Sequence, residues 1–195
     1  MLEEKKISDF NLNHIIYISI GPHLDENLDS IIYRKNKEIE YFGKSLWAFN
    51  SGIANYVYKL CNKQFSDDES IYCVMINSGK PTKSEGKKAR YYEESDGEMI
   101  EIPDKMRVTF AQNGAYALLV DEYYKIIGDN IIYTKEYDYE NSKKYVRGFG
   151  LLNKKHNDIK LKKPSKADLP KEVLYIAKLK KPFLVKIFKE KPDNK

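Results

Sequence analysis

Short runs of apolar, β-branched residues alternate with polar breaks in the first half of the chain. The run His14–Ile20 predicts a buried strand, because β-branched residues favour extended backbone. Leu28, Ile31 and Ile32 then recur at helical spacing, which predicts a short helix. We expect a polar loop over residues 36–40, and the next element begins beyond it.

A second strand and helix follow, and strands dominate afterwards. Ser45–Phe49 predicts a strand, and Ser51 is a candidate N-cap for a helix to about residue 62. Residues 121–127 fit either a short helix or a continuation of the preceding strand. Further strands are expected at Ile71–Ile76, Met106–Phe110, Tyr116–Val120, Ile131–Thr134 and Tyr145–Leu152.

This order of elements predicts an α+β fold. We expect a mostly antiparallel, split sheet with two helices in the N-terminal half, because the helices come early and strands follow. Charge suggests a boundary: residues 154–195 contain fourteen Lys and five acids, while residues 1–153 contain 20 basic and 24 acidic residues. We therefore expect a single α+β domain over 1–153 and a basic C-terminal extension over 154–195 that packs on the domain or trails it.

Composition narrows the classes of protein. Cys61 and Cys73 form no CxxC pair, so we expect buried thiols in a reducing, cytoplasmic setting. The N-terminus has no apolar leader, and no apolar run reaches the ~18 residues of a membrane span. The three histidines form no zinc motif, so no metal is predicted.

One stretch resembles a known family. Residues 43–49 (GKSLWAF), followed by Ala54-Asn55-Tyr56, resemble the poly(ADP-ribose)-polymerase-like branch of the ADP-ribosyltransferase fold. That branch has a Gly-Lys-Gly-aliphatic-Tyr-Phe-Ala strand and then a helix with Ser-x-x-Tyr. The resemblance covers roughly residues 14–80. It departs from the family in the first strand, which lacks the His or Arg that holds the cofactor, and near Ile53, where the helical Ser is expected.

The resemblance implies an NAD-binding enzyme that transfers ADP-ribose to a macromolecular target. Trp47 and Tyr56 would clamp the nicotinamide, and Glu122 would stabilise the ribose cation of the transition state. Further cofactor-binding candidates are Ser45, Tyr17 and His14. Taken alone, Trp47 also fits a core aromatic, Tyr56 a helix face packed on the sheet, and Glu122 a solvated surface acid.

Tyrosines interleaved with lysines support a second hypothesis. The pairs Tyr91-Tyr92 and Tyr123-Tyr124, together with Tyr133, Tyr137 and Tyr139, lie in or near polar, Lys-bearing segments. Such residues can stack on single-stranded nucleic acid or anchor a protein partner. A non-catalytic interaction protein fits this pattern, including an inhibitor encoded by a phage or mobile element. Under both hypotheses the basic tail is either a simple solvated segment or an arm that contacts a polyanion. Without Arg it is not suited to reading bases.

Overall fold

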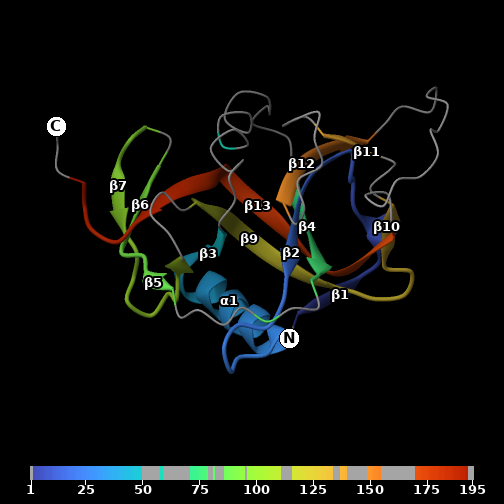
Figure 1. Cartoon of the computed structure of the whole chain (residues 1–195), viewed down its shortest axis with the longest axis horizontal. Helices are drawn as coiled ribbons and strands as arrows, with labels where there is room; N and C mark the ends of the chain where they lie inside the picture. Colours follow the sequence, from blue (N-terminus) through green and yellow to red (C-terminus); the bar gives the residue numbers. More distant parts are fainter. Residues whose placement is uncertain are drawn as a thin grey trace.

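Strands make up most of the chain that the computed structural model describes (Figure 1). The described residues are 2–49, 58, 71–78, 81, 86–94, 96–110, 116–133, 137–139, 149–154 and 170–192. No helix among them is long and apolar enough to cross a membrane.

The elements follow one another along the chain with one α-helix among them. The N-terminal part contains β1 (Glu3–Lys5), the 3-10 helix η1 (Ile7–Asp9), β2 (His14–Ile20), α1 (Leu28–Phe42) and β3 (Ser45–Phe49). The middle contains β4 (Ile71–Asn77), β5 (Lys87–Lys88), β6 (Tyr91–Glu93), β7 (Met99–Glu101), β8 (Thr109–Phe110) and β9 (Tyr116–Ile126). The last strands are β10 (Ile131–Tyr133), β11 (Tyr137–Tyr139), β12 (Phe149–Lys154) and β13 (Pro170–Phe188).

The main sheet is large and mixed. Its strand order is β1-β9-β13-β4-β2-β12-β11, and β3, β6, β7 and β10 pair along its sides. The pairs β1–β9 and β2–β4 are parallel, whereas the other pairs are antiparallel. The predicted α+β fold with a mostly antiparallel sheet and two helices is therefore wrong: the described elements are mostly strands, with one α-helix and a mixed sheet.

Strand β13 holds the sheet together. It pairs with β10 at its start, with β4 and β9 on its two sides, and with β6 at its end. In Figure 1 it is the long red ribbon that crosses the molecule. These residues belong to the predicted C-terminal extension, and they form an internal strand of the sheet. The boundary between residues 153 and 154 stays a prediction.

Two irregularities bend the pairing of β13 with β9. Between Leu179 and Leu184, β13 has four residues without a paired Cα on β9, and Pro182 lies among them. Proline has no N–H to donate, so an irregular segment suits it better than a regular ladder. On β9, Asp121 is skipped between Val120 and Glu122. This extra residue reverses the alternation of side chains beyond it.

Helix α1 is longer than the sequence pattern suggested. Its N-cap is Asn27, whose side chain accepts a hydrogen bond of 2.8 Å from the N–H of Ser30. Its C-cap is Gly43, in the left-handed conformation (φ 68°) that glycine adopts without strain. The expected loop over 36–40 is wrong, because those residues lie inside α1. The expected helix from Ser51 lies outside the described residues, apart from Tyr58.

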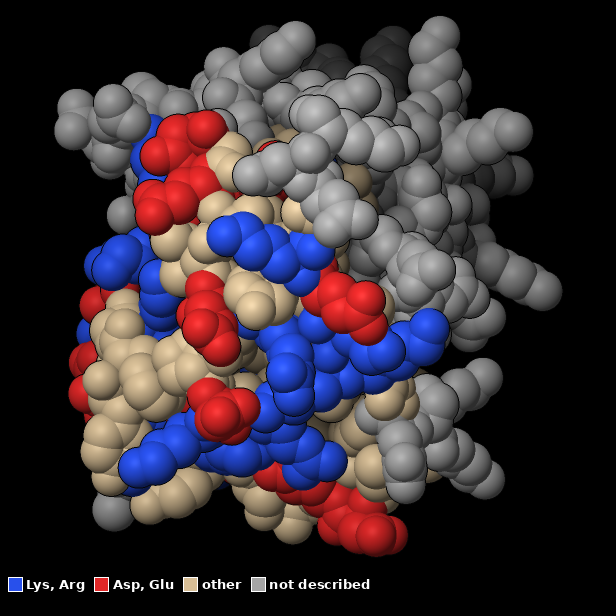
Figure 2. All heavy atoms as spheres, turned by 90° about the vertical axis from the view of Figure 1, so that its left-hand side faces the viewer, with Lys and Arg blue, Asp and Glu red and all other residues tan. Residues whose placement is uncertain are grey.

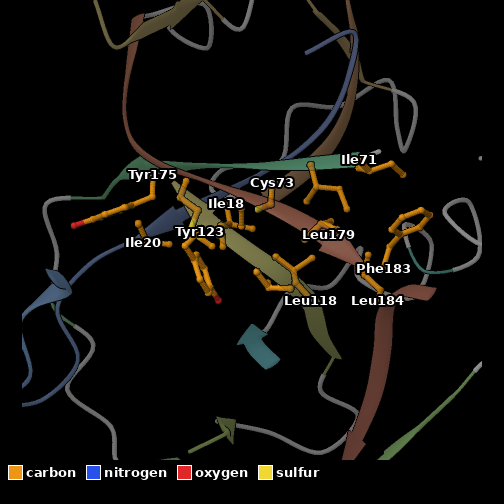
Figure 3. Packing of buried hydrophobic residues seen from close by; sticks show 14 of the residues in the cluster. Ile18, Ile20, Ile71, Cys73, Leu118, Tyr123, Tyr175, Leu179, Phe183 and Leu184 are labelled. Carbon is orange, nitrogen blue, oxygen red and sulfur yellow. The ribbon is translucent and has the colours of Figure 1, made fainter. Parts of the chain in front are cut away.

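Two faces of the sheet carry separate cores. The Cys73 face contains Ile16, Ile18, Cys73, Met75, Ala177 and Leu179, and Ile32 of α1 packs with them. Figure 3 shows Ile18, Cys73 and Leu179 within this core. The Tyr17 face, on the opposite side of the same strands, contains Ile15, Tyr17, Val74 and Ile176. A third cluster lies around β6 and the first half of β9, and includes Leu46, Tyr92, Ala117, Val185 and Ile187. Alternation along each strand separates these sets.

Several strand predictions are confirmed. The strands at His14–Ile20 and Ser45–Phe49 have the expected bounds, and β4 extends one residue beyond its expected end. Of the two alternatives for residues 121–127, the structure has the strand, because β9 continues to Ile126. Within Met106–Phe110 only Thr109 and Phe110 are in a strand.

Candidate functional site

Two of the predicted cofactor-binding residues lie on the Cys73 face. Ser45 and Trp47 of β3 are opposite Val120 and Leu118 of β9. The Ser45 hydroxyl is buried and lies 3.0 Å from the hydroxyl of Tyr123. The Trp47 ring is half-buried, with its centroid 6.4 Å from that of Tyr123. Trp47 therefore packs at the side of the core, and its predicted partner Tyr56 lies outside the described residues.

Tyr17 and Glu122 lie on the other side of the sheet. Tyr17 is 1% exposed and packs in the core of the Tyr17 face. Glu122 is paired in register with Lys178, and alternation from Tyr123 places it on that same face. The sheet thus separates these two residues from Ser45 and Trp47. His14, at the exposed start of β2, lies by alternation from Ile16 on the Cys73 face, with β4, β13 and β9 between its strand and β3.

Glu122 has partners of its own. Its carboxylate lies 3.4 Å from Nζ of Lys178 and accepts a hydrogen bond from the hydroxyl of Tyr124. Lys178 also lies 3.9 Å from the carboxylate of Asp121. Lys178 belongs to the basic C-terminal region and the two acids to the mildly acidic body. Part of the charge asymmetry of the sequence is therefore neutralised where β13 pairs with β9.

The described residues contain no group of three or more His, Cys, Asp or Glu side chains suited to a metal ion. Cys73 is a free, fully buried thiol, and burial raises its pKa well above the usual value. A thiol with a raised pKa is a poor nucleophile at neutral pH. This part of the chain therefore offers neither a metal centre nor a reactive cysteine.

Basic side chains gather where β5, β6 and the end of β13 meet. Figure 2 shows a band of Lys and Arg across this side of the molecule, with acidic side chains around it. Six exposed residues define what we call the basic face: Lys87, Lys88, Arg90, Lys105, Arg107 and Lys189.

Backbone hydrogen bonds fix these segments to one another. The N–H of Arg90 donates to the carbonyl of Phe188 (2.8 Å), next to Lys189, and the carbonyl of Arg90 accepts from the N–H of Ile102 (2.8 Å). Strands β5 and β8 pair beside them, with Lys88 opposite Thr109. Three segments that are distant in sequence, each carrying exposed cations, are thus held next to one another.

Only half of the basic face is neutralised by ion pairs. Lys88 lies 3.0 Å from Asp104, Arg107 lies 3.4 Å from Glu26, and Lys189 lies 3.1 Å from Glu190. Such exposed pairs are weak and exchange readily with solvent or a ligand. The side chains of Lys87, Arg90 and Lys105 make no direct ion pair with a residue in the described ranges, although Lys88 and, to a smaller extent, Arg90 lower the pKa of the Asp104 carboxyl.

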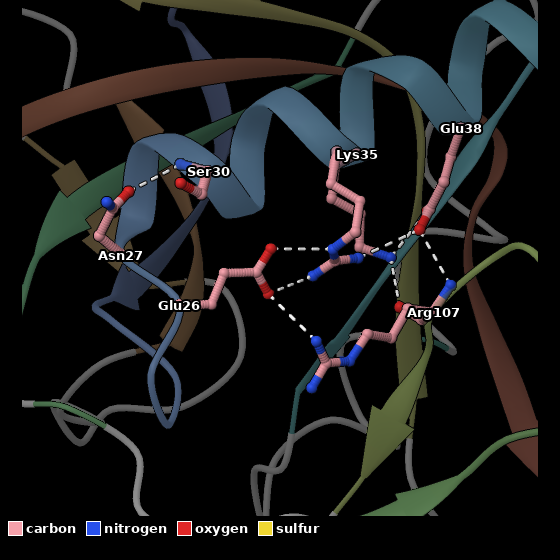
Figure 4. A network of polar contacts seen from close by, with 7 residues as sticks. Glu26, Asn27, Ser30, Lys35, Glu38 and Arg107 are labelled. Atoms are coloured by element: carbon pink, nitrogen blue, oxygen red, sulfur yellow. Dashed lines mark hydrogen bonds and ion pairs between the residues drawn. The ribbon is translucent and has the colours of Figure 1, made fainter.

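A buried polar network attaches the basic face to α1 (Figure 4). Lys35 is 4% exposed, and its Nζ donates to the Glu38 carboxylate and to the carbonyl of Arg107, both at 2.8 Å. Glu38 also accepts from the N–H of Arg107 at 3.0 Å. Burial lowers the pKa of Lys35 to about 8, against the opposing effect of Glu38.

Arg34 completes the network. Its guanidinium makes two bonds of 3.0 Å to the carboxylate of Glu26 and one of 3.2 Å to Glu38. The hydrogen bonds from Arg34 hold the pKa of Glu26 below its usual value, so this acid stays charged at neutral pH. Arg34 thus fixes Glu26 at one end of the network, and Lys35 and Glu38 fix the backbone of Arg107 at the other. The segment that carries Lys105 and Arg107 is therefore held against the helix.

Comparison of the chain with known protein families, with curated proteins and with solved structures finds no match in any of the three. The basic face was not predicted from the sequence, which pointed to the Lys-rich tail. Its signal is weak, because the segment from Lys87 to Arg107 mixes bases with acids. Only the folded arrangement brings its cations together with Lys189.

Proposed function

We propose that this protein is a non-catalytic nucleic-acid-binding protein whose basic face contacts the phosphate backbone. The observation that carries the proposal is the group of exposed cations at Lys87, Arg90 and Lys105, which make no direct ion pair with a described residue and lie on segments that hydrogen bonds fix together. Cations that neutralise phosphates release counterions, which supplies binding free energy without base readout. This proposal selects one of the two hypotheses that the sequence left open.

Binding to a fluorescein-labelled oligonucleotide of mixed sequence, measured by fluorescence anisotropy at several salt concentrations, tests the proposal. The variant Lys87→Gln/Arg90→Gln/Lys105→Gln removes these three cations. We expect weaker binding to every sequence and a salt slope reduced by about 2 to 3 units, as three lost phosphate contacts imply.

A matched control removes the same charge elsewhere. Lys6, Lys125 and Lys171 lie near β1, the end of β9 and the start of β13, at the opposite end of β13 from Lys189. The variant Lys6→Gln/Lys125→Gln/Lys171→Gln has the same net charge as the test variant. If the two variants lose the same affinity for the oligonucleotide, the loss depends only on net charge, and the basic face is rejected as the binding site.

NAD-dependent ADP-ribosyl transfer stays a prediction from the sequence, with Trp47, Tyr56 and Glu122 as its residues. Thermal unfolding with millimolar NAD tests it directly, because a ligand that binds the folded state raises the midpoint. A shift that Trp47→Leu removes would support the prediction. An unchanged midpoint would reject it.

A further inference from the structure

Arg107 is the cation of the basic face whose backbone the buried polar network holds. Its N–H donates to the carboxylate of Glu38 (3.0 Å), and its carbonyl accepts from Nζ of Lys35 (2.8 Å). Met106, the preceding residue, is 1% exposed and packs in the core, while Lys105 and Arg107 on either side of it are exposed. Both cations therefore lie on the outer side of a segment whose backbone is already fixed.

The guanidinium of Arg107 is held less firmly than its backbone. The side chain is 49% exposed, and Nη1 lies 3.4 Å from Oε2 of Glu26 (Figure 4). Among the described residues, Glu26 is the one acid with which this guanidinium pairs. An arginine has five N–H donors, so one long contact leaves most of them available to a ligand that approaches from solvent.

Glu26 does not depend on Arg107 for its hydrogen bonds. Arg34 donates one bond of 3.0 Å to each oxygen of the Glu26 carboxylate. The backbone N–H and carbonyl of Glu26 each make a bond of 3.0 Å with His23, so the residue is fixed in its turn. If Arg107 moves away, both carboxylate oxygens keep a donor. The contact between Arg107 and Glu26 is therefore the one that exchanges most readily.

We propose that Arg107 exchanges Glu26 for a backbone phosphate of the bound nucleic acid, so that Glu26 is a built-in competitor for this contact. The inference rests on the proposed function and adds a regulating residue to the same site. The exchange gives up one long bond to a carboxylate, and the guanidinium fork gains two parallel bonds to the oxygens of one phosphate. Because the backbone of Arg107 is fixed beforehand, little ordering is needed on binding.

Fluorescence anisotropy with the labelled oligonucleotide tests the phosphate contact. We expect Arg107→Gln to lower the salt slope by about 1 and to weaken binding about fivefold at about 150 mM salt, as the loss of one contact implies. Arg107→Lys keeps the charge but not the fork, so it should keep the slope and bind more weakly than the wild type. Lys6→Gln removes an exposed cation near β1 and should leave the slope unchanged.

Glu26→Gln tests the competition. An exposed pair is worth at most about fivefold in an equilibrium constant, so this variant should bind about two- to fivefold more tightly than the wild type. The gain should be smaller when Arg107→Gln is also present, because the competitor acts through Arg107. Glu3→Gln is the matched control: Glu3 pairs with Lys5 at 2.8 Å on β1, and its removal should not tighten binding.

Three results would overturn the inference while the proposed function stands. These are an Arg107→Gln protein with wild-type affinity and slope, no gain in Glu26→Gln, and equal gains from Glu26→Gln with and without Arg107. Circular dichroism checks that each variant is folded, and if Glu26→Gln is not, the two Arg107 variants decide. If the wild type binds no oligonucleotide, the proposed function and this inference are both wrong.

Discussion

One buried carboxylate decides how the basic face is held. Glu38 is 3% exposed and accepts hydrogen bonds from the side chains of Arg34 and Lys35 and from the N–H of Arg107. A buried carboxylate with three donors of this kind is satisfied, and the Lys35 ammonium beside it donates two hydrogen bonds. Removing one partner of such a pair is far more costly than replacing both, because the remaining charge stays buried without compensation.

Glu38→Ala should therefore lower the free energy of unfolding by about 3–5 kcal/mol. Glu40→Ala is the matched control, because Glu40 belongs to the exposed pair with Lys37 and its loss should cost less than about 1 kcal/mol. Urea unfolding of both variants measures the difference. The double variant Lys35→Met/Glu38→Leu should be more stable than Glu38→Ala, and the reverse order would show that the pair itself supplies the stability.

Strands were predictable from this sequence where both sides of the strand are buried. Runs such as Ile15–Ile18 and Val74–Ile76 are continuous and β-branched or apolar because β2 and β4 have a core on each face. Helix α1 was predicted too short because its buried side includes Lys35 and Glu38, which a hydropathy pattern counts as solvent-exposed. The parallel pairs and the strand order depend on long-range pairing, which no local pattern encodes.

The central position of β13 in the sheet predicts the effect of removing it by truncation. Strand β13 lies between β4 and β9 and contributes Ala177, Leu179 and Leu184 to the Cys73 face, all buried. A chain that ends at Lys154 loses this strand and exposes two ladders of hydrogen-bonding groups. We expect that chain to show no cooperative thermal transition by circular dichroism.

A chain that ends at Lys189 serves as the control, because it keeps all of β13. Its midpoint should stay within a few degrees of the full-length value. A cooperative transition in the shorter chain, near the wild-type midpoint, would instead show that residues 1–154 form an independent domain.

The candidate site was less predictable than the strands. The sequence predicted a binding surface of tyrosines interleaved with lysines but did not predict the basic face, because the segment from Lys87 to Arg107 mixes bases with acids. It assigned the positive charge to the tail, where Lys178 and Lys186 instead pair with acids of neighbouring strands. The sheet face on which a charged side chain lies, and the residues that it contacts, depend on bulges and on strand order. Neither of these can be predicted from a local sequence pattern.

At the scale of the whole molecule, we expect salt to weaken nucleic-acid binding strongly but to change the thermal stability only slightly. The exposed ion pairs, such as Lys88–Asp104 and Lys37–Glu40, each contribute less than about 1 kcal/mol, whereas the cores on both sheet faces do not depend on salt. Raising salt from about 50 to 500 mM should therefore move the thermal midpoint by only a few degrees. The same change should weaken oligonucleotide binding about 100- to 500-fold if three phosphates are neutralised. Anisotropy and thermal unfolding on one sample measure both. Affinity that does not change with salt would exclude phosphate contacts. A thermal midpoint that falls together with the affinity would show that salt destabilises the folded protein, so the loss of binding could not be attributed to phosphate contacts.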